Sequence, residues 1–175
     1  HSYNNADNNL LRSAQSHYNQ VETLNLGYRA ALNLHGVEKH QISRGDHLSN
    51  LDAFNSINQF LANISILKSE NKILKQNQRL RFHIGTNEVI GRISICEKNN
   101  LNPGENGVCL IKLERPVVIS FQDQFLIRTY SPMKTIGGGV VDDIDCLGKW
   151  KELKQYAIKL SRNSSIQDKM AFIIE

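Results

Sequence analysis

Hydrophobic and polar residues alternate in short runs through most of the chain between residues 9 and 142. Gly, Pro, Asn and Asp separate these runs, as turn residues separate strands. The pattern predicts a mainly β fold, either a barrel or a sandwich. The expected strands are residues 10–16, 27–34, 60–67, 79–84, 89–96, 107–113, 117–121, 124–130 and 138–141.

The strand at residues 79–84 has the clearest pattern. Three hydrophobic residues alternate with three basic ones, and successive side chains of a strand point to opposite faces of its sheet. The strand is therefore expected to bury one set and to display the other on the surface. The buried set is Leu80, Phe82 and Ile84, and the displayed set is Arg79, Arg81 and His83.

The period changes after residue 141. Helical spacing relates Trp150, Leu153, Ala157 and Leu160, so we expect these four on one face of a helix. A capping box of Ser164 with Gln167 predicts a second helix directly afterwards. Two short helices bury little surface alone, so they either pack on the β structure or belong to a domain that continues further.

Residues 49–59 are polar with scattered hydrophobic residues, which predicts an interdomain connection and a boundary near residue 50. The sequence starts without Met and without a signal-peptide pattern, so we expect a fragment. No apolar run approaches the roughly 18 residues that a membrane span needs. The three cysteines, Cys96, Cys109 and Cys146, form no Cys-x-x-Cys pair, which favours a reducing compartment.

The positive charge is concentrated in the middle of the chain. The formal net charge is +4, and between residues 49 and 134 Lys and Arg outnumber Asp and Glu by 11 to 7, whereas the two balance on either side. One interpretation is an ordinary solvated surface. The other is a patch for an acidic partner, with nucleic acid as the first candidate.

Catalytic patterns are not found in the sequence. The glycines at 137–139 lack the Lys-Ser or Lys-Thr of a phosphate-binding loop and are typical of close backbone packing. The histidines and the aspartates at 142, 143 and 145 do not have the spacing of zinc or calcium ligands. With no nucleophile motif either, we expect no enzymatic activity within this chain.

Three stretches carry a family resemblance. They are Arg-Ser-Ala-Gln-Ser-His at 12–17 with Ile-Ser-Arg-Gly-Asp at 42–46, Arg-Phe-His-Ile-Gly-Thr-Asn-Glu at 81–88, and Ser-Pro-Met-Lys-Thr-Ile-Gly-Gly-Gly at 131–139. Together they resemble the selenocysteine-specific elongation factor, a translational GTPase related to elongation factor Tu. The Ser-Pro insertion before Thr-Ile-Gly-Gly-Gly favours the selenocysteine factor over elongation factor Tu.

The resemblance implies an elongation factor Tu-type antiparallel β-barrel, the family's third domain, at residues 50–142. Residues 1–49 would be the C-terminal half of the second-domain barrel, and 143–175 a helical linker and the start of a winged-helix domain. A half barrel exposes strand edges, which implies pairing with another copy, docking on the third domain, or disorder. The GTPase domain, with its GTP and Mg²⁺, would lie outside this sequence, so we expect no cofactor here.

The resemblance also implies partners: selenocysteyl-tRNA, the ribosome, and an mRNA hairpin bound through winged-helix domains beyond this sequence. The setting would be cytoplasmic, with no membrane. Arg12 would lie near the selenocysteyl group, where a guanidinium favours the ionised selenol. The alternative is that Arg12 is an ordinary exposed strand residue.

The residues expected to bind the acceptor and T stem of the tRNA are Arg81, His83, Arg92, Arg128, Lys134, Thr135, Gly137, Gly138 and Gly139. A stem is bound through phosphates and 2′-hydroxyls, which need basic groups and close backbone approach. The alternative for the glycines is tight strand packing. The alternative for the whole barrel is a docking platform for the GTPase domain of another translational GTPase, without RNA contacts.

Overall fold

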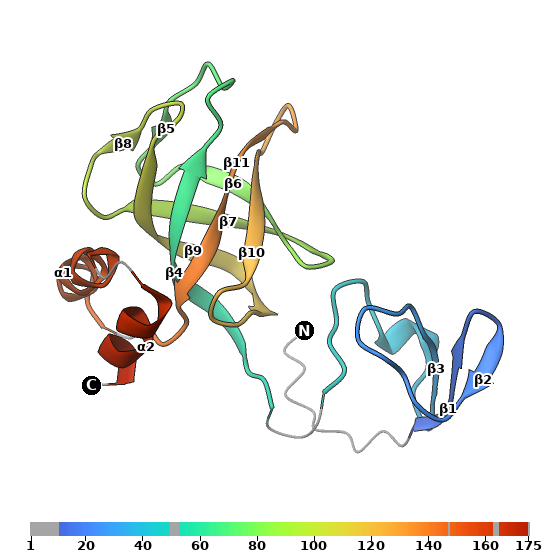
Figure 1. The fold of residues 1–175 in the computed structure, drawn as a ribbon. Coiled ribbons are helices and arrows are strands. Elements are labelled where there is room, and N and C mark those ends of the chain that lie inside the picture. Colours follow the sequence, from blue (N-terminus) through green and yellow to red (C-terminus); the bar gives the residue numbers. More distant parts are fainter. Residues whose placement is uncertain (1–10, 50–52, 147, 163–164, 175) are drawn as a thin grey trace. The chain divides into compact units, whose positions relative to one another are not determined.

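The computed structural model describes residues 11–49, 53–146, 148–162 and 165–174 (Figure 1). The chain divides into two compact units, residues 1–53 and 54–175, and each is described by itself. Strands outnumber helices in both units, which confirms the mainly β fold.

The first unit is a three-stranded antiparallel sheet in the order β2-β1-β3, followed by a short 3-10 helix. Its elements are β1 (Leu11–Ser16), β2 (Asn19–Val21), β3 (Ala31–Leu34) and η1 (Lys39–Gln41). The strand expected at 27–34 begins only at Ala31, because Gly27 lies in a turn with a φ of 83°. Ala14, with 7% of its surface exposed, is the buried hydrophobic residue in the described part of this unit.

The second unit contains a closed six-stranded antiparallel barrel in the circular order β10-β11-β4-β9-β7-β6 (Figure 1). The sheet closes on itself, so the architecture is a barrel and not the sandwich that the sequence pattern also allowed. A two-stranded ribbon, β5 with β8, accompanies it. The strands are β4 (Ser56–Ile66), β5 (Leu74–Lys75), β6 (Arg79–Ile84), β7 (Asn87–Ile95), β8 (Asn100–Leu101), β9 (Asn106–Val118), β10 (Gln124–Thr129) and β11 (Thr135–Asp143).

Strand β6 has the predicted bounds and the predicted two faces. Leu80 and Phe82 are fully buried in the barrel core, and Ile84 is nearly so. Phe125 of β10 packs edge-on against Phe60, with ring centroids 5.7 Å apart, and lies 6.0 Å from Phe82. Hydrophobic side chains from several strands therefore fill the barrel interior.

Strand β9 is longer than predicted. The sequence indicates two strands, 107–113 and 117–121, whereas the structure has one strand from Asn106 to Val118 that includes Pro116. The register against β4 shifts between Ile57 and Gln59, and Pro116 falls inside this irregularity, where its missing N–H costs no ladder bond. Strand β4 in turn begins at Ser56, inside the segment predicted to be a connection.

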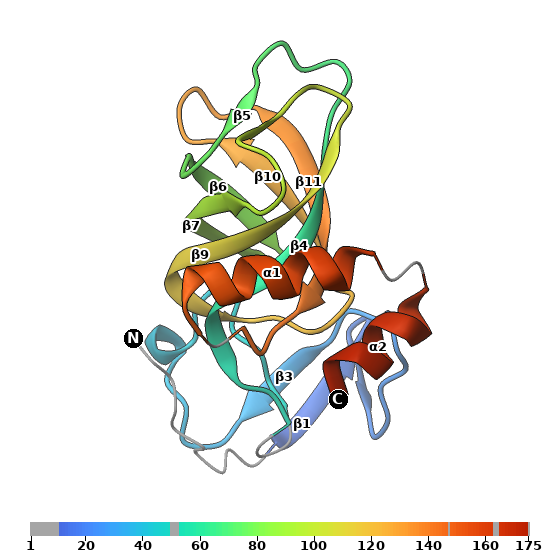
Figure 2. The same ribbon diagram turned by 90° about the vertical axis from the view of Figure 1, so that its left-hand side faces the viewer.

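Helix α1 (Trp150–Ser161) packs on the outer surface of the barrel over β4 and β9 (Figure 2). It buries Leu153, Ala157 and Leu160 against outward-facing residues that include Leu61 and Leu110. Trp150 was expected on the buried face as well, but 40% of its surface is exposed. Of the two expected alternatives, α1 therefore follows the first and packs on the β structure.

Helix α2 (Ile166–Ile174) has a capping pair one residue later than predicted. The N–H of Asp168 donates to Ser165 Oγ (3.0 Å), and the N–H of Ser165 donates to Asp168 Oδ2 (3.3 Å). Ser164, the predicted cap, lies outside the described residues, and Gln167 lies within the helix. Asp168 thus takes the part that Glu or Gln has in a capping box.

The three cysteines are free and buried. Burial raises the pKa of the Cys96 thiol to about 11 and raises the pKa of the other two thiols further. All three are therefore protonated, unreactive core residues at neutral pH. Within the described residues no helix is long and apolar enough to cross a membrane.

Candidate nucleic-acid interface

Several predicted residues align across strands on the outside of the barrel. In one row, Thr135 of β11 is opposite Arg128 of β10, which is opposite Arg81 of β6. A second row runs from Gly138 through Leu126 to His83. Strand pairing therefore brings together residues that are more than 50 positions apart in the sequence.

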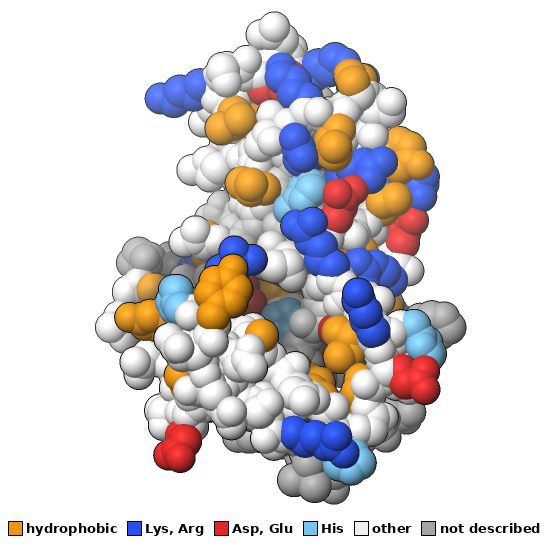
Figure 3. Space-filling model, turned by 90° about the vertical axis from the view of Figure 1, so that its right-hand side faces the viewer, with side chains coloured by type: hydrophobic (Ala, Val, Ile, Leu, Met, Phe, Trp, Pro, Cys, Tyr) orange, Lys and Arg blue, Asp and Glu red, His pale blue; other side chains and the backbone are white. Residues whose placement is uncertain are grey.

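A third row extends the basic surface across the barrel. Arg79 of β6 is opposite Arg92 of β7, and Arg92 is opposite Lys112 of β9. We call these outward side chains the basic sheet face; its members are Arg79, Arg81, His83, Arg92, Lys112 and Arg128. Figure 3 shows Lys and Arg side chains gathered on this side of the barrel, with few acidic side chains among them.

Two arginines of the basic sheet face are ion-paired within the barrel. Arg79 forms a bidentate pair with Glu114, with Nε 2.7 Å from Oε1 and Nη2 2.8 Å from Oε2. Arg81 donates from Nη1 to Glu88 and from Nε to the carbonyl oxygen of Tyr130 (3.2 Å). The guanidinium of Arg79 lowers the pKa of Glu114. These pairs fix the two side chains and neutralise part of the positive surface.

Tyr130, just beyond the end of β10, holds the same two arginines from another side. The guanidinium carbons of Arg79 and Arg81 lie 4.7 and 5.0 Å from the centroid of its ring, within cation–π distance. The ring is 42% exposed. Sequence reasoning did not select Tyr130, because the register that places it beside β6 is not visible in a single strand.

Arg128 differs from its neighbours because no ion pair is present for it within the described residues. Its Nε is buried without a hydrogen-bond partner, and so is Nε2 of His83 in the adjacent row. A buried polar atom without a partner costs free energy, and a ligand that supplies acceptors would recover it. Phosphate oxygens are acceptors of the kind that arginine binds.

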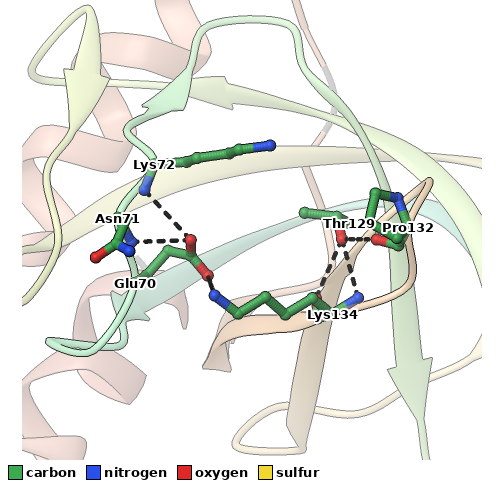
Figure 4. A network of polar contacts seen from close by, with 6 residues as sticks. All are labelled: Glu70, Asn71, Lys72, Thr129, Pro132 and Lys134. Carbon is green, nitrogen blue, oxygen red and sulfur yellow. Dashed lines mark hydrogen bonds and ion pairs between the residues drawn. The ribbon is translucent and has the colours of Figure 1, made fainter.

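Lys134, in the β10–β11 hairpin, is bound to a buried carboxylate (Figure 4). Its Nζ lies 3.0 Å from Oε2 of Glu70, whose side chain is 4% exposed. The backbone N–H groups of Asn71 and Lys72 donate to the other oxygen of Glu70. Hydrogen bonding from Lys134, with that from Asn71, lowers the pKa of Glu70. Lys134 therefore has a structural partner in addition to any role in binding.

The glycine run allows adjacent strands to approach. A Cβ on Gly137 would lie 2.3 Å from the carbonyl oxygen of Ser65, and one on Gly138 would lie 2.7 Å from that of Phe125. A Cβ on Gly139 would lie 2.7 Å from both Asn63 O and the Phe125 ring. Strand packing alone thus accounts for all three glycines, and their contact with tRNA stays a prediction.

Arg12 is exposed on β1 of the first unit, whereas the residues of the basic sheet face all belong to the second unit. The register between β1 and β3 shifts between Leu11 and Ser13, so Arg12 is the residue at a bulge. Bulges change the direction of a side chain and are frequent beside binding sites. This geometry is compatible with either interpretation of Arg12.

The described residues contain no group of three or more His, Cys, Asp or Glu side chains placed to hold a metal ion. Asp142, one of the three clustered aspartates, instead pairs with Lys169 of α2, with Oδ1 2.6 Å from Nζ. This pair is nearly buried and joins α2 to the end of β11. The aspartates thus have a structural role at this position.

Comparison with known proteins finds one matching family model and a curated relative. Residues 61–146, from the middle of β4 to just beyond β11, match the model of the "Selenocysteine-specific elongation factor, beta-barrel domain". The chain is 29% identical over 139 residues to the selenocysteine-specific elongation factor of Desulfomicrobium baculatum, a match that covers 79% of this chain and 22% of that protein. The chain thus spans about a fifth of the length of that curated relative. Its closed barrel is similar to the β-barrel domain of the selenocysteine-specific elongation factor, as the sequence resemblance implies.

Proposed function

We propose that the basic sheet face binds the acceptor and T stem of selenocysteyl-tRNA. The single observation that carries the proposal is the alignment of Arg128 and Arg81 across β10 and β6, beside the parallel row of Arg79, Arg92 and Lys112. Double-stranded RNA is recognised mainly through its phosphates and 2′-hydroxyls. A rigid sheet with cations in neighbouring rows suits such a backbone.

The whole protein, in this proposal, is a cytoplasmic translational GTPase that delivers selenocysteyl-tRNA to the ribosome. GTP and Mg²⁺ would bind to a GTPase domain, and winged-helix domains would bind the mRNA hairpin. Within this chain, Arg12 would contribute to the pocket for the selenocysteyl group. The family match of the barrel supports these assignments.

Arg128 gives the sharpest test, because changing it breaks no ion pair. We expect Arg128→Gln to weaken binding of a selenocysteine-tRNA acceptor/T-stem minihelix and to reduce the slope of log affinity against log salt by about one. Fluorescence anisotropy at several KCl concentrations measures both. Lys75→Gln, an exposed lysine on β5, is the matched control and should bind normally.

Charge reversals at Arg81 and Lys134 are weaker tests. Each would bring a new carboxylate against an existing one, Glu88 or Glu70, and so would destabilise the barrel. Glutamine variants with a thermal melt as control avoid this problem. Unchanged minihelix binding by both Arg128→Gln and Arg81→Gln would contradict the proposal.

A second candidate function, docking of the barrel on another protein domain, is favoured by one observation. Leu126, in the row with Gly138 and His83, is 54% exposed although most of β10 is buried or half-buried. An exposed leucine among internally neutralised arginines fits a protein contact. Leu126→Ser would then weaken domain docking and leave minihelix affinity unaltered.

A further inference from the structure

Helix α1 carries a second concentration of positive charge. Five basic residues and one acidic residue, Glu152, occupy positions 149–162. The basic residues are Lys149, Lys151, Lys154, Lys159 and Arg162. Since Leu153, Ala157 and Leu160 face the barrel, Lys151, Lys159 and Arg162 are exposed and Lys154 is half-buried beside them.

These charges are not neutralised as those of Arg79 and Arg81 are. Within the described part of the chain no ion pair is present for any of the five basic residues of α1. Glu152 accepts from the backbone N–H of Lys149 at 3.4 Å. Glu97, near the C-terminal end of the helix, bonds to Ser161 Oγ instead. The outer side of α1 therefore keeps its positive charge.

Helix stability does not explain the lysines at the N-terminal end of α1. Lys149 is the N-cap residue and Lys151 lies in the first turn. The helix dipole is positive at this end, so cations there are mildly unfavourable, whereas acidic residues would be favourable. Their presence indicates a function other than folding.

An aromatic ring accompanies these charges. Trp150 lies between Lys149 and Lys151, precedes Lys154 by one helical turn, and is 40% exposed. An indole is large and apolar, and its exposure beside lysines is the combination used to stack nucleobases while cations bind the phosphates. A duplex keeps its bases stacked inside, so this combination fits a single strand.

The helix is on the opposite side of the barrel from Arg128 and Arg81 of the basic sheet face, although Lys112 of that face lies on β9. In the circular order β10-β11-β4-β9-β7-β6, the β4–β9 pair that carries α1 is opposite the β10–β6 pair that carries Arg128 and Arg81. Figure 2 shows α1 lying across the β4–β9 side of the barrel. A ligand on α1 therefore does not compete for Arg128 and Arg81.

We propose that the outer side of α1, with Trp150 at its N-terminal end, is a binding surface for single-stranded RNA. Lys151, Lys154 and Lys159 bind successive phosphates, and Trp150 stacks on a base. This surface shares no residue with the proposed tRNA site, so each can be tested by its own variants.

The test uses the whole chain and a mixed-sequence 12-nucleotide single-stranded RNA, with a 12-base-pair RNA duplex for comparison. Trp150 is the single tryptophan of the chain, so its fluorescence reports binding at this position. We expect the single strand to quench this fluorescence. We also expect the triple variant Lys151→Gln, Lys154→Gln, Lys159→Gln to bind about tenfold more weakly, with a salt slope lower by about two.

The matched control removes three exposed lysines elsewhere, by Lys68→Gln, Lys72→Gln and Lys75→Gln. It should bind the single strand as the wild type does, because its lysines lie outside α1. Trp150→Leu should weaken single-strand binding about tenfold through the loss of stacking. Circular dichroism melts check that the variants fold.

Three results would overturn the proposal: unchanged fluorescence of Trp150 with saturating single strand, wild-type affinity of the α1 triple variant, or equal loss in the control triple variant. Arg128→Gln separates this proposal from the tRNA proposal. It should weaken duplex binding alone, and the α1 variants should weaken single-strand binding alone.

Discussion

Gly139 occupies a position where no side chain fits, between the backbone of β4 and the ring of Phe125. A Cβ there would lie 2.7 Å from Asn63 O and 2.7 Å from Phe125 Cζ. Real Cβ atoms do not approach so closely, and the carbonyl belongs to a paired strand that cannot move freely. The residue therefore sets how closely β11 and β4 pair.

We expect Gly139→Ala to destabilise the barrel by about 1–3 kcal/mol, the usual cost of overpacking. Urea unfolding measures the free energy of unfolding. Gln124→Ala, at an exposed position of the adjacent strand β10, is the control and should change it by less than about 0.5 kcal/mol. A stability equal to wild type for Gly139→Ala would show that β4 can shift.

The pair of Glu70 with Lys134 makes stability depend on pH. The pKa of Glu70 is lowered from its ordinary value of 4.5 by hydrogen bonding from Lys134. A carboxyl with a lower pKa in the folded state contributes stability above its unfolded pKa and loses it as pH falls through the folded pKa. The barrel should therefore lose stability in the acid range below pH 4.5.

Replacing Glu70 tests this linkage directly. Glu70→Gln should lower the melting temperature at pH 7 and should make the melting temperature less dependent on pH in the acid range. Melting temperatures from pH 7 down to pH 3 measure both effects. Equal acid dependence in the variant and the wild type would contradict the assignment to Glu70.

At the scale of elements, α1 depends on a few buried side chains. Leu160 is fully buried against the outer surface of β4 and β9. Leu160→Ala should destabilise the second unit by about 2–5 kcal/mol, because it removes buried methyl groups and leaves a cavity. Gln155→Ala, on the exposed side of the same helix, is the control. Urea unfolding followed by circular dichroism distinguishes them, and an equal effect would contradict this packing.

Sequence patterns predict an element well when several hydrophobic and polar residues alternate within that element. Strand β6 was predicted with its bounds and both faces, because its six residues alternate without interruption. Strands β5 and β8 have two residues each, too few to show any period. Strand β9 was predicted as two strands because Pro116 indicates a break, and only the irregular pairing with β4 allows it to continue.

The candidate site was predicted residue by residue but not as an arrangement. The alternation in β6 exposes Arg81 and His83, and the family resemblance adds Arg128 and Lys134. Their alignment depends on which strands pair and in which register, and Tyr130 was missed for the same reason. Nor could the sequence show that Arg79 pairs with Glu114, 35 residues away.

At the scale of the whole molecule, the two units differ in how much they bury. The barrel unit contains both hydrophobic clusters, whereas the first unit exposes large hydrophobic residues such as Tyr18 and Leu26. Its sheet also has unpaired strand edges at β2 and β3 among the described residues. Pairing with another copy, docking on the third domain and disorder, the three expected consequences of such edges, stay predictions.

The sequence by itself determined the β class, the inward set of hydrophobic residues in its clearest strand and the family of the barrel. Periodicity is a property of one strand or helix, so it can be read locally. Tertiary structure alone decided the order in which six strands close the barrel, the packing of α1 and the neutralisation of Arg79, Arg81 and Lys134. Each of these features depends on which distant segments lie side by side. The same packing pairs Arg79 and Arg81 of β6 with glutamates and leaves the basic residues of α1 without ion pairs among the described residues.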